Sequence, residues 1–225
     1  MSKDFVKVAL GSIPELSVGK TRNTIKLYTG SPKKQIMFDM PIVRLPFGAS
    51  IDRFKTYTSN NVYYLEASVD EEFAEYWNEF TEKLVDVVDT NRETFDTNLS
   101  RDEIKAGFKN GLKTNDYGSL LKLNLPRDRL GDFNFHVFDK SKQKLNVDDS
   151  NIASILEKGA YCKALVKVSK MWSFKDKDMF GLTLELFQLK LADKPEVADT
   201  GSCEDEGEGP GEGEGPGDVK FEFLE

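Results

Sequence analysis

The sequence predicts a mainly β (α+β) protein, an elaborated OB-fold-like barrel with one long helix, one or two short helices and a disordered acidic tail. Apolar and polar residues alternate over residues 1–67 and again over residues 119–192, and a helical period separates the two regions. A small Greek-key barrel with a long two-stranded ribbon suits this order. A β-sandwich with inserted helices fits the same pattern.

Six strands are expected in the first 67 residues, where Gly and Pro punctuate the alternation. Their expected ranges are 5–10, 24–28, 35–38, 42–45, 53–58 and 61–67. The last two flank Ser59 and Asn60 and are expected to pair as a hairpin.

The period changes to that of a helix after Ser68. Ser68 and Glu71 have the spacing of a capping box, and apolar residues follow every three or four positions as far as Val88, which predicts a helix of about 20 residues. Its acidic face is interpreted as solvated rather than metal-binding, because no histidine and no second acidic helix complete a site. A second capping box, Ser100 with Glu103, predicts a shorter helix that ends near Gly111.

Four strand-like stretches follow this second helix. They cover residues 119–126, 132–145, 159–172 and 179–192, with a short helical insert expected at 151–157.

The residues for nucleophilic or metal chemistry are scarce. Cys162 and Cys203 form no metal-binding pattern, and His136 is the only histidine. We therefore expect no enzyme, no metal and no cofactor.

One short segment is similar to part of a phosphate-binding loop. Gly19, Lys20 and Thr21 match its GK[ST] end, but Pro14 stands where the first Gly belongs. The residues that follow read as a strand instead of the required helix, so nucleotide hydrolysis is not expected here.

The charge is divided unevenly along the chain. The net charge is -8, but residues 193–225 carry twelve acids against two lysines, which leaves residues 1–192 with 29 basic and 27 acidic residues, a balance of +2. We expect a folded domain over 1–192 and a disordered tail over 193–225 that repeats GEGPG. Its aromatic end, Phe221, Phe223 and Leu224, is expected to dock on a partner, although an acidic segment can also serve only solubility.

No apolar run approaches the length that spans a bilayer, and the first residues lack a cleavable apolar segment. The sequence therefore predicts an intracellular protein without a membrane partner.

Basic and aromatic residues share faces of several predicted strands, which is what a single strand of nucleic acid needs: cations for phosphates and rings for bases. Packing of the rings in the core and ordinary surface charge explain the same composition. Besides the residues around the turn of the last hairpin, the candidate nucleic-acid-binding residues are Lys122, Phe138, Lys140, Tyr161, Lys163, Lys167, Lys170, Arg53 and Tyr57.

The last predicted hairpin carries a recognisable pattern, W-x-F-K-x-K-x-x-F-G-L with a later Q-L-K-L. It contains Trp172, Phe174, Lys175, Lys177 and Phe180. This stretch resembles the C-terminal signature of the single-stranded DNA-binding proteins of nucleocytoplasmic large DNA viruses. The resemblance covers mainly residues 120–192.

The layout is also similar to that of the single-stranded DNA-binding proteins of T7-like phages and of bacteria, in which an OB-type body precedes an acidic tail tipped with Phe. In those families the tail recruits replication enzymes and competes with DNA. The chain departs from them at Glu225, its last residue, and at Lys220, which interrupts the acidic run.

The leading hypothesis is a sequence-tolerant single-stranded DNA-binding protein of a DNA virus, acting in replication, recombination or repair in the host nucleus or at a cytoplasmic replication site. Trp172, Phe174 and Phe180 are the stacking candidates, and the lysines, including Lys175 and Lys177, are expected to contact phosphates. Asp176 and Asp178 of the turn are expected to keep this binding reversible. A viral structural or interaction module is the alternative, and a homo-oligomer stays open.

Overall fold

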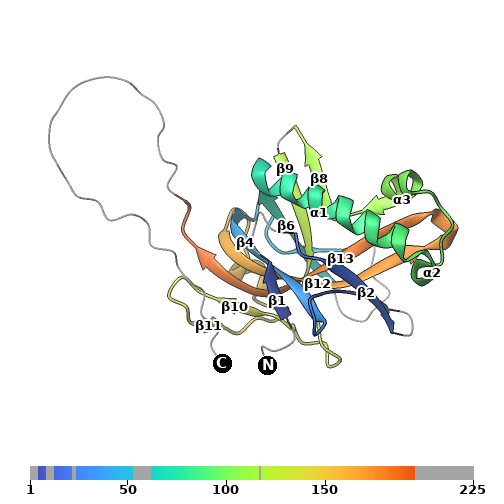
Figure 1. Ribbon diagram of the computed structural model, residues 1–225. Helices are drawn as coiled ribbons and strands as arrows, with labels where there is room; N and C mark the ends of the chain where they lie inside the picture. The colour runs from blue at the N-terminus through green and yellow to red at the C-terminus, as the bar shows by residue number, and fades with distance from the viewer. Residues whose placement is uncertain (1–4, 9–12, 22–23, 53–61, 117, 196–225) are drawn as a thin grey trace, which may run out of the picture.

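The computed structural model describes residues 5–8, 13–21, 24–52, 62–116 and 118–195 (Figure 1). Within these ranges the chain is mainly β, with one long helix and three short ones. The predicted fold class is confirmed. Of the hairpin expected from strands 53–58 and 61–67, the first strand and the turn lie outside the described residues, as does the tail beyond residue 195, and the second strand is β6 (Tyr63–Val69).

Five strands form a closed ring, the centre of the OB-like architecture. In ring order they are β12 (Tyr161–Phe174), β4 (Lys34–Arg44), β6 (Tyr63–Val69), β9 (Gly118–Asn124) and β13 (Met179–Ala192). Glu185 of β13 pairs with Asn124 of β9 and closes the ring. Closure gives each ring strand two neighbours and turns alternate side chains inward, which forms one core.

The other strands extend this ring. β1 (Phe5–Val8) pairs with β4, β2 (Leu16–Thr21) with β3 (Thr24–Thr29), β5 (Ser50–Ile51) with β6, β7 (Phe108–Lys109) and β10 (His136–Phe138) with β13, β8 (Leu112–Asn115) with β9, and β11 (Lys144–Leu145) with β10. β3 lies against both β4 and β12.

The two strands predicted at 35–38 and 42–45 are a single strand, β4. Its register with β12 shifts at Met40 and Pro41, which together face one residue of β12. Proline has no N–H to give to the ladder, and a bulge accommodates it without ending the strand. The strand β2 was not predicted.

Helix α1 (Glu71–Thr90) has the predicted length but a different cap. The Asp70 side chain accepts a hydrogen bond from the Phe73 backbone N–H at 2.8 Å, whereas Ser68 still belongs to β6. The capping box expected from Ser68 is therefore wrong, because pairing with β9 keeps Ser68 extended. No helix among the described residues is long and apolar enough to cross a membrane.

The shorter helices lie close to the predicted positions. α3 (Arg101–Gly107) begins with the capping box of Ser100 and Glu103, which is confirmed. α4 (Ile152–Ile155) is the predicted insert, and α2 (Arg92–Phe95) follows α1 directly.

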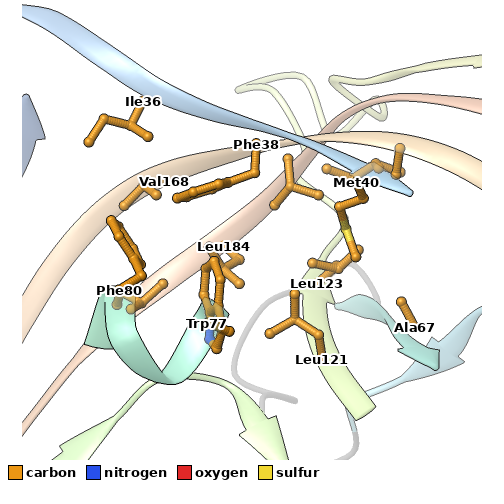
Figure 2. Close-up of a cluster of buried hydrophobic side chains, with 14 of the residues drawn as sticks. Ile36, Phe38, Met40, Ala67, Trp77, Phe80, Leu121, Leu123, Val168 and Leu184 are labelled. Atoms are coloured by element: carbon orange, nitrogen blue, oxygen red, sulfur yellow. The ribbon is translucent and has the colours of Figure 1, made fainter. Parts of the chain in front are cut away.

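The core forms where α1 packs on the ring. Trp77 and Phe80 of α1 point at Phe38 of β4, with ring centroids 5.2 and 4.9 Å away, and Val168 and Leu184 of the ribbon complete the cluster (Figure 2). All five side chains are buried.

The acidic face of α1 is partly neutralised by α3. Arg101 contacts Glu82 and Asp86 at 3.0 and 2.8 Å, and Lys105 contacts Glu82 at 2.6 Å. The hydrogen bond from Lys105 is the largest of the effects that lower the pKa of Glu82. No cluster of His, Cys, Asp and Glu in the described parts of the chain is arranged to hold a metal ion.

Candidate nucleic-acid interface

The strands β12 and β13 pair over their full lengths and form a long ribbon. The ribbon extends from the barrel, and its far end lies near α2 and α3 (Figure 1). A bulge at Ser169 shifts the register of β12 by one residue. Because side chains alternate along a strand, this extra residue turns Lys170, Trp172 and Phe174 to the face that carries Lys163 and Lys167.

Trp172 and Phe174 form a ring pair on this outward face of the ribbon. Their ring centroids are 5.0 Å apart at an interplanar angle of 43°. Phe174 is 56% exposed and Trp172 is half-buried. An aromatic residue this exposed is available to stack on a flat ligand.

A glycine on the neighbouring strand makes room for the indole. Gly181 pairs with Trp172 across the ribbon, and a Cβ atom at this position would overlap both the indole and the Lys109 carbonyl oxygen. The absence of a side chain at Gly181 therefore leaves the space that the indole of Trp172 occupies.

The ring pair borders a cleft of about 680 Å³ between the ribbon, the β2–β3 hairpin and α2. Beyond Met171, which pairs with Ile25, β12 is paired only with β13 among the described strands. The polar and charged residues that line the cleft are Lys20, Thr94, Asp96, Lys170, Ser173, Lys175 and Thr183.

The cleft has an excess of positive charge, since three lysines and one aspartate line its described walls. Lys20 Nζ donates to the Thr94 carbonyl at 3.2 Å, and Lys175 Nζ donates to Asp96 Oδ2 at 3.1 Å. Lys170 is exposed and has no ion pair with any described residue. Rings and cations at one cleft are the combination that single-stranded nucleic acid requires.

The far end of the ribbon is held in place by the helical segment. Ser173 Oγ donates to the Phe95 carbonyl at 3.1 Å, and β7 pairs with β13. Gly107 lies so close to the Asp178 carbonyl oxygen that a Cβ atom would overlap it. These contacts hold the end of the ribbon against α2 and α3, beside the cleft.

Phe180, a predicted stacking residue, lies in the core instead. It pairs with Ser173, so it points to the opposite face from Trp172, and it is 3% exposed. Its ring contacts Phe95 with a centroid distance of 6.4 Å. Phe180 packs α2 against the ribbon and cannot stack on a base in this arrangement.

The predicted lysines Lys163 and Lys167 lie farther along the outward face of β12. Lys163 is 3.6 Å from Asp39, and Lys167 is 3.2 Å from Glu185. Both pairs are about three-quarters buried, so these charges are more compensated than those at the cleft.

Lys122 and Lys177 are not part of the cleft. Lys122 lies on β9, 3.1 Å from the buried Asp52 and 4.2 Å from the centre of the Tyr64 ring. Lys177 lies in the exposed turn of the ribbon.

Three predicted residues lie at the other end of the ribbon. Tyr161 begins β12, roughly 40 Å along the strand from Phe174. Phe138 of β10 is half-buried, and Lys140 forms an ion pair with Asp193. Arg53, Tyr57, Phe221, Phe223 and Leu224 lie outside the described residues, so their predicted roles stay predictions.

Sequence patterns did not indicate that Lys20, Thr94 and Asp96 belong to this site. Lys20 lies in β2, and the strand β3 follows it, as the sequence predicted when it argued against a phosphate-binding loop. Lys20 is 74 residues from Thr94, and Asp96 is 79 from Lys175. No local pattern in a single sequence reports contacts over such separations.

No protein-family model matches the chain, and no curated protein does either. The chain is similar to the solved structure of the single-stranded DNA-binding protein from bacteriophage Enc34, with a TM-score of 0.44 and 12% identity over 84% of this chain and 96% of that one. The same phage protein in complex with ssDNA gives a TM-score of 0.46 and 11% identity, over 82% of this chain and 98% of that one. For gp2.5, a single-stranded DNA-binding protein encoded by bacteriophage T7, the TM-score is 0.46 and the identity is 13%, over 75% of this chain and 98% of that one.

Proposed function

We propose that this protein binds single-stranded DNA with little sequence preference, through the cleft and the outward face of the ribbon. The observation that carries the proposal is the pair of accessible rings, Trp172 and Phe174, beside a cleft with three lysines. Every base has a flat face, so stacking on these rings is tolerant of sequence.

The lysines of the cleft would neutralise the phosphates of the bound strand. Lys20, Lys170 and Lys175 approach the cleft from β2, β12 and the ribbon turn. Lys167 and Lys163 extend the same face along β12, where phosphates would compete with Glu185 and Asp39. Binding that depends on a few local cations should weaken steeply as salt is added.

We place this activity in the replication, recombination or repair of viral DNA, as the resemblance to viral single-stranded DNA-binding proteins implies. The acidic residues 193–225 would compete with DNA for the lysines, and the aromatic end of this segment would recruit other replication proteins. The alternative function is a viral structural or interaction module in which this segment serves solubility.

Fluorescence anisotropy with labelled oligo-dT and with duplex DNA tests the proposal. We expect binding to oligo-dT at low salt, weaker binding to duplex DNA, and a loss of about 1–3 kcal/mol of binding free energy for Trp172→Ala or Phe174→Ala. Phe47→Ala is the matched control, since Phe47 is 55% exposed and does not line the cleft.

Two results would contradict the proposal. The absence of oligo-dT binding at low salt would favour the structural module. Equal losses for Phe174→Ala and Phe47→Ala would show that binding does not use the cleft.

A further inference from the structure

Asp96 is the only carboxylate among the residues that the structure places around the cleft. Its partner is Lys175, and the two side chains are 72% and 71% exposed. An ion pair this exposed adds little to stability, so it can open while the fold stays intact. The cleft therefore contains a carboxylate, Asp96, that is paired with one of its three lysines, Lys175.

The position of this carboxylate is set by the backbone around it. Asp96 ends α2 in the left-handed conformation, with φ 53° and ψ 54°. The hydrogen bond from Ser173 to the Phe95 carbonyl holds the preceding residue against the ribbon. Asn and Gly adopt the left-handed conformation at least as readily as Asp, so the backbone alone does not require an acid here.

We propose that Asp96 limits the affinity of the cleft for single-stranded DNA by competing with phosphate for Lys175. The inference rests on the proposed function. In the free protein Lys175 is paired with Asp96, and a bound strand must break that pair and leave a phosphate near an unpaired carboxylate. Both effects oppose binding, so the wild-type cleft holds DNA less tightly than its lysines would allow.

Asp176, in the turn of the ribbon, is less well placed than Asp96 to compete with phosphate. Asp176 lies between the two lysines of the turn, but it does not line the cleft, and no described residue forms an ion pair with it. Asp96 is distant in sequence and lies on the cleft wall. The acid that competes with phosphate is therefore the one on the cleft wall, Asp96, and not the one next to Lys175 in the sequence, Asp176.

The substitution Asp96→Asn in the full chain tests the proposal, with oligo-dT anisotropy titrations at several salt concentrations. We expect binding to become about two- to fivefold tighter at low salt, the range that corresponds to an exposed ion pair. Asp176→Asn is the matched control, because it removes the same charge beside the same lysine without opening the pair.

A double substitution shows whether the effect passes through Lys175. In a Lys175→Gln background, Asp96→Asn should have less effect than in the wild type, since the competition for this cation no longer exists. Asp96→Gly, which also suits the left-handed backbone, repeats the measurement if the Asn variant folds poorly.

Several outcomes would overturn the inference. Unchanged or weaker binding by both Asp96 variants would show that Asp96 has no role or positions Lys175. An equal gain from Asp176→Asn would reduce the effect to net charge. If the wild-type chain fails to bind oligo-dT, the proposed function itself fails, whereas binding without a gain in the variants overturns only the role of Asp96.

Discussion

Cys162 shows how burial changes the chemistry of a single residue. It lies on the inward face of β12, is 1% exposed, and packs in the main core. Burial disfavours the thiolate and raises the pKa of the Cys162 thiol from 9.0 to about 12. The folded protein therefore keeps this thiol protonated at a pH where the unfolded chain releases the proton.

This difference predicts that the protein loses stability in alkaline solution. Above pH 9 the unfolded state binds fewer protons at Cys162 than the folded state, so the free energy of unfolding falls as the pH rises toward 12. Between pH 8 and pH 10 the loss should be about 1.4 kcal/mol, the equivalent of one pH unit. Urea unfolding at both pH values measures it.

Cys162→Ala is the control for the alkaline effect. The variant should be less stable than the wild type at pH 8, because the substitution leaves a small cavity. Between pH 8 and pH 10, however, its free energy of unfolding should not show the decrease that comes from Cys162. The same decrease in both proteins would assign the effect to other groups.

At the scale of elements, the ribbon depends on the helical segment between β6 and β7. α2 contacts one side of its far end through Phe95, and the end of α3 contacts the turn through Gly107. The segment 71–109 thus builds the core with α1 and also fixes the cleft. Helices inserted between two strands need not contact a distant hairpin, so these contacts are a specific feature of this fold.

Gly107→Ala is expected to weaken this anchorage. The added methyl group would overlap the Asp178 carbonyl oxygen, which belongs to the backbone and cannot move without shifting the turn. We expect a loss of about 1–3 kcal/mol in the free energy of unfolding and weaker oligo-dT binding, measured by urea unfolding and anisotropy.

The neighbouring Ala106 provides the control for this prediction. It is exposed in the same turn of α3, so Ala106→Ser should change stability by no more than about 0.5 kcal/mol. A Gly107→Ala variant as stable as Ala106→Ser would show that the turn adjusts without strain.

At the scale of the whole molecule, the sign of the charge differs between two parts of the chain. The body is near neutral with a balance of +2, and residues 193–225 carry -10. Among the cleft residues three lysines face one aspartate, so the local excess is not visible in the overall charge of -8. An acidic segment on the same chain has a high effective concentration near these lysines.

Removal of residues 196–225 should tighten oligo-dT binding at low salt, because the acids of this segment no longer compete for the lysines. The truncation retains Asp193, which pairs with Lys140. The gain should shrink as salt screens the charges, and anisotropy titrations at two salt concentrations measure it.

A variant with these acids replaced by Asn and Gln separates charge from chain length. If charge is the cause, this full-length variant should bind as tightly as the truncated one. Affinity that is unchanged by both alterations would rule out competition by residues 196–225.

Local rules predicted those parts of the molecule that depend on neighbouring residues. The alternation over residues 179–192 predicted the strand β13, and the Ser100–Glu103 spacing predicted the start of α3. Both signals act over a few residues, so a single sequence contains them. The cap of α1 was misplaced by two residues because strand pairing kept Ser68 extended.

The sequence by itself determined the mainly β class, the long helix and the presence of rings and lysines near the ribbon turn. Only the tertiary structure decided which of them meet. The bulge at Ser169 placed Trp172 and Phe174 on the outward face of the ribbon, while the pairing of Phe180 with Ser173 placed Phe180 in the core. Contacts across more than 70 residues brought Lys20 and Asp96 to the cleft. Register and long-range packing are cooperative properties of the whole chain, so no short stretch of sequence encodes them.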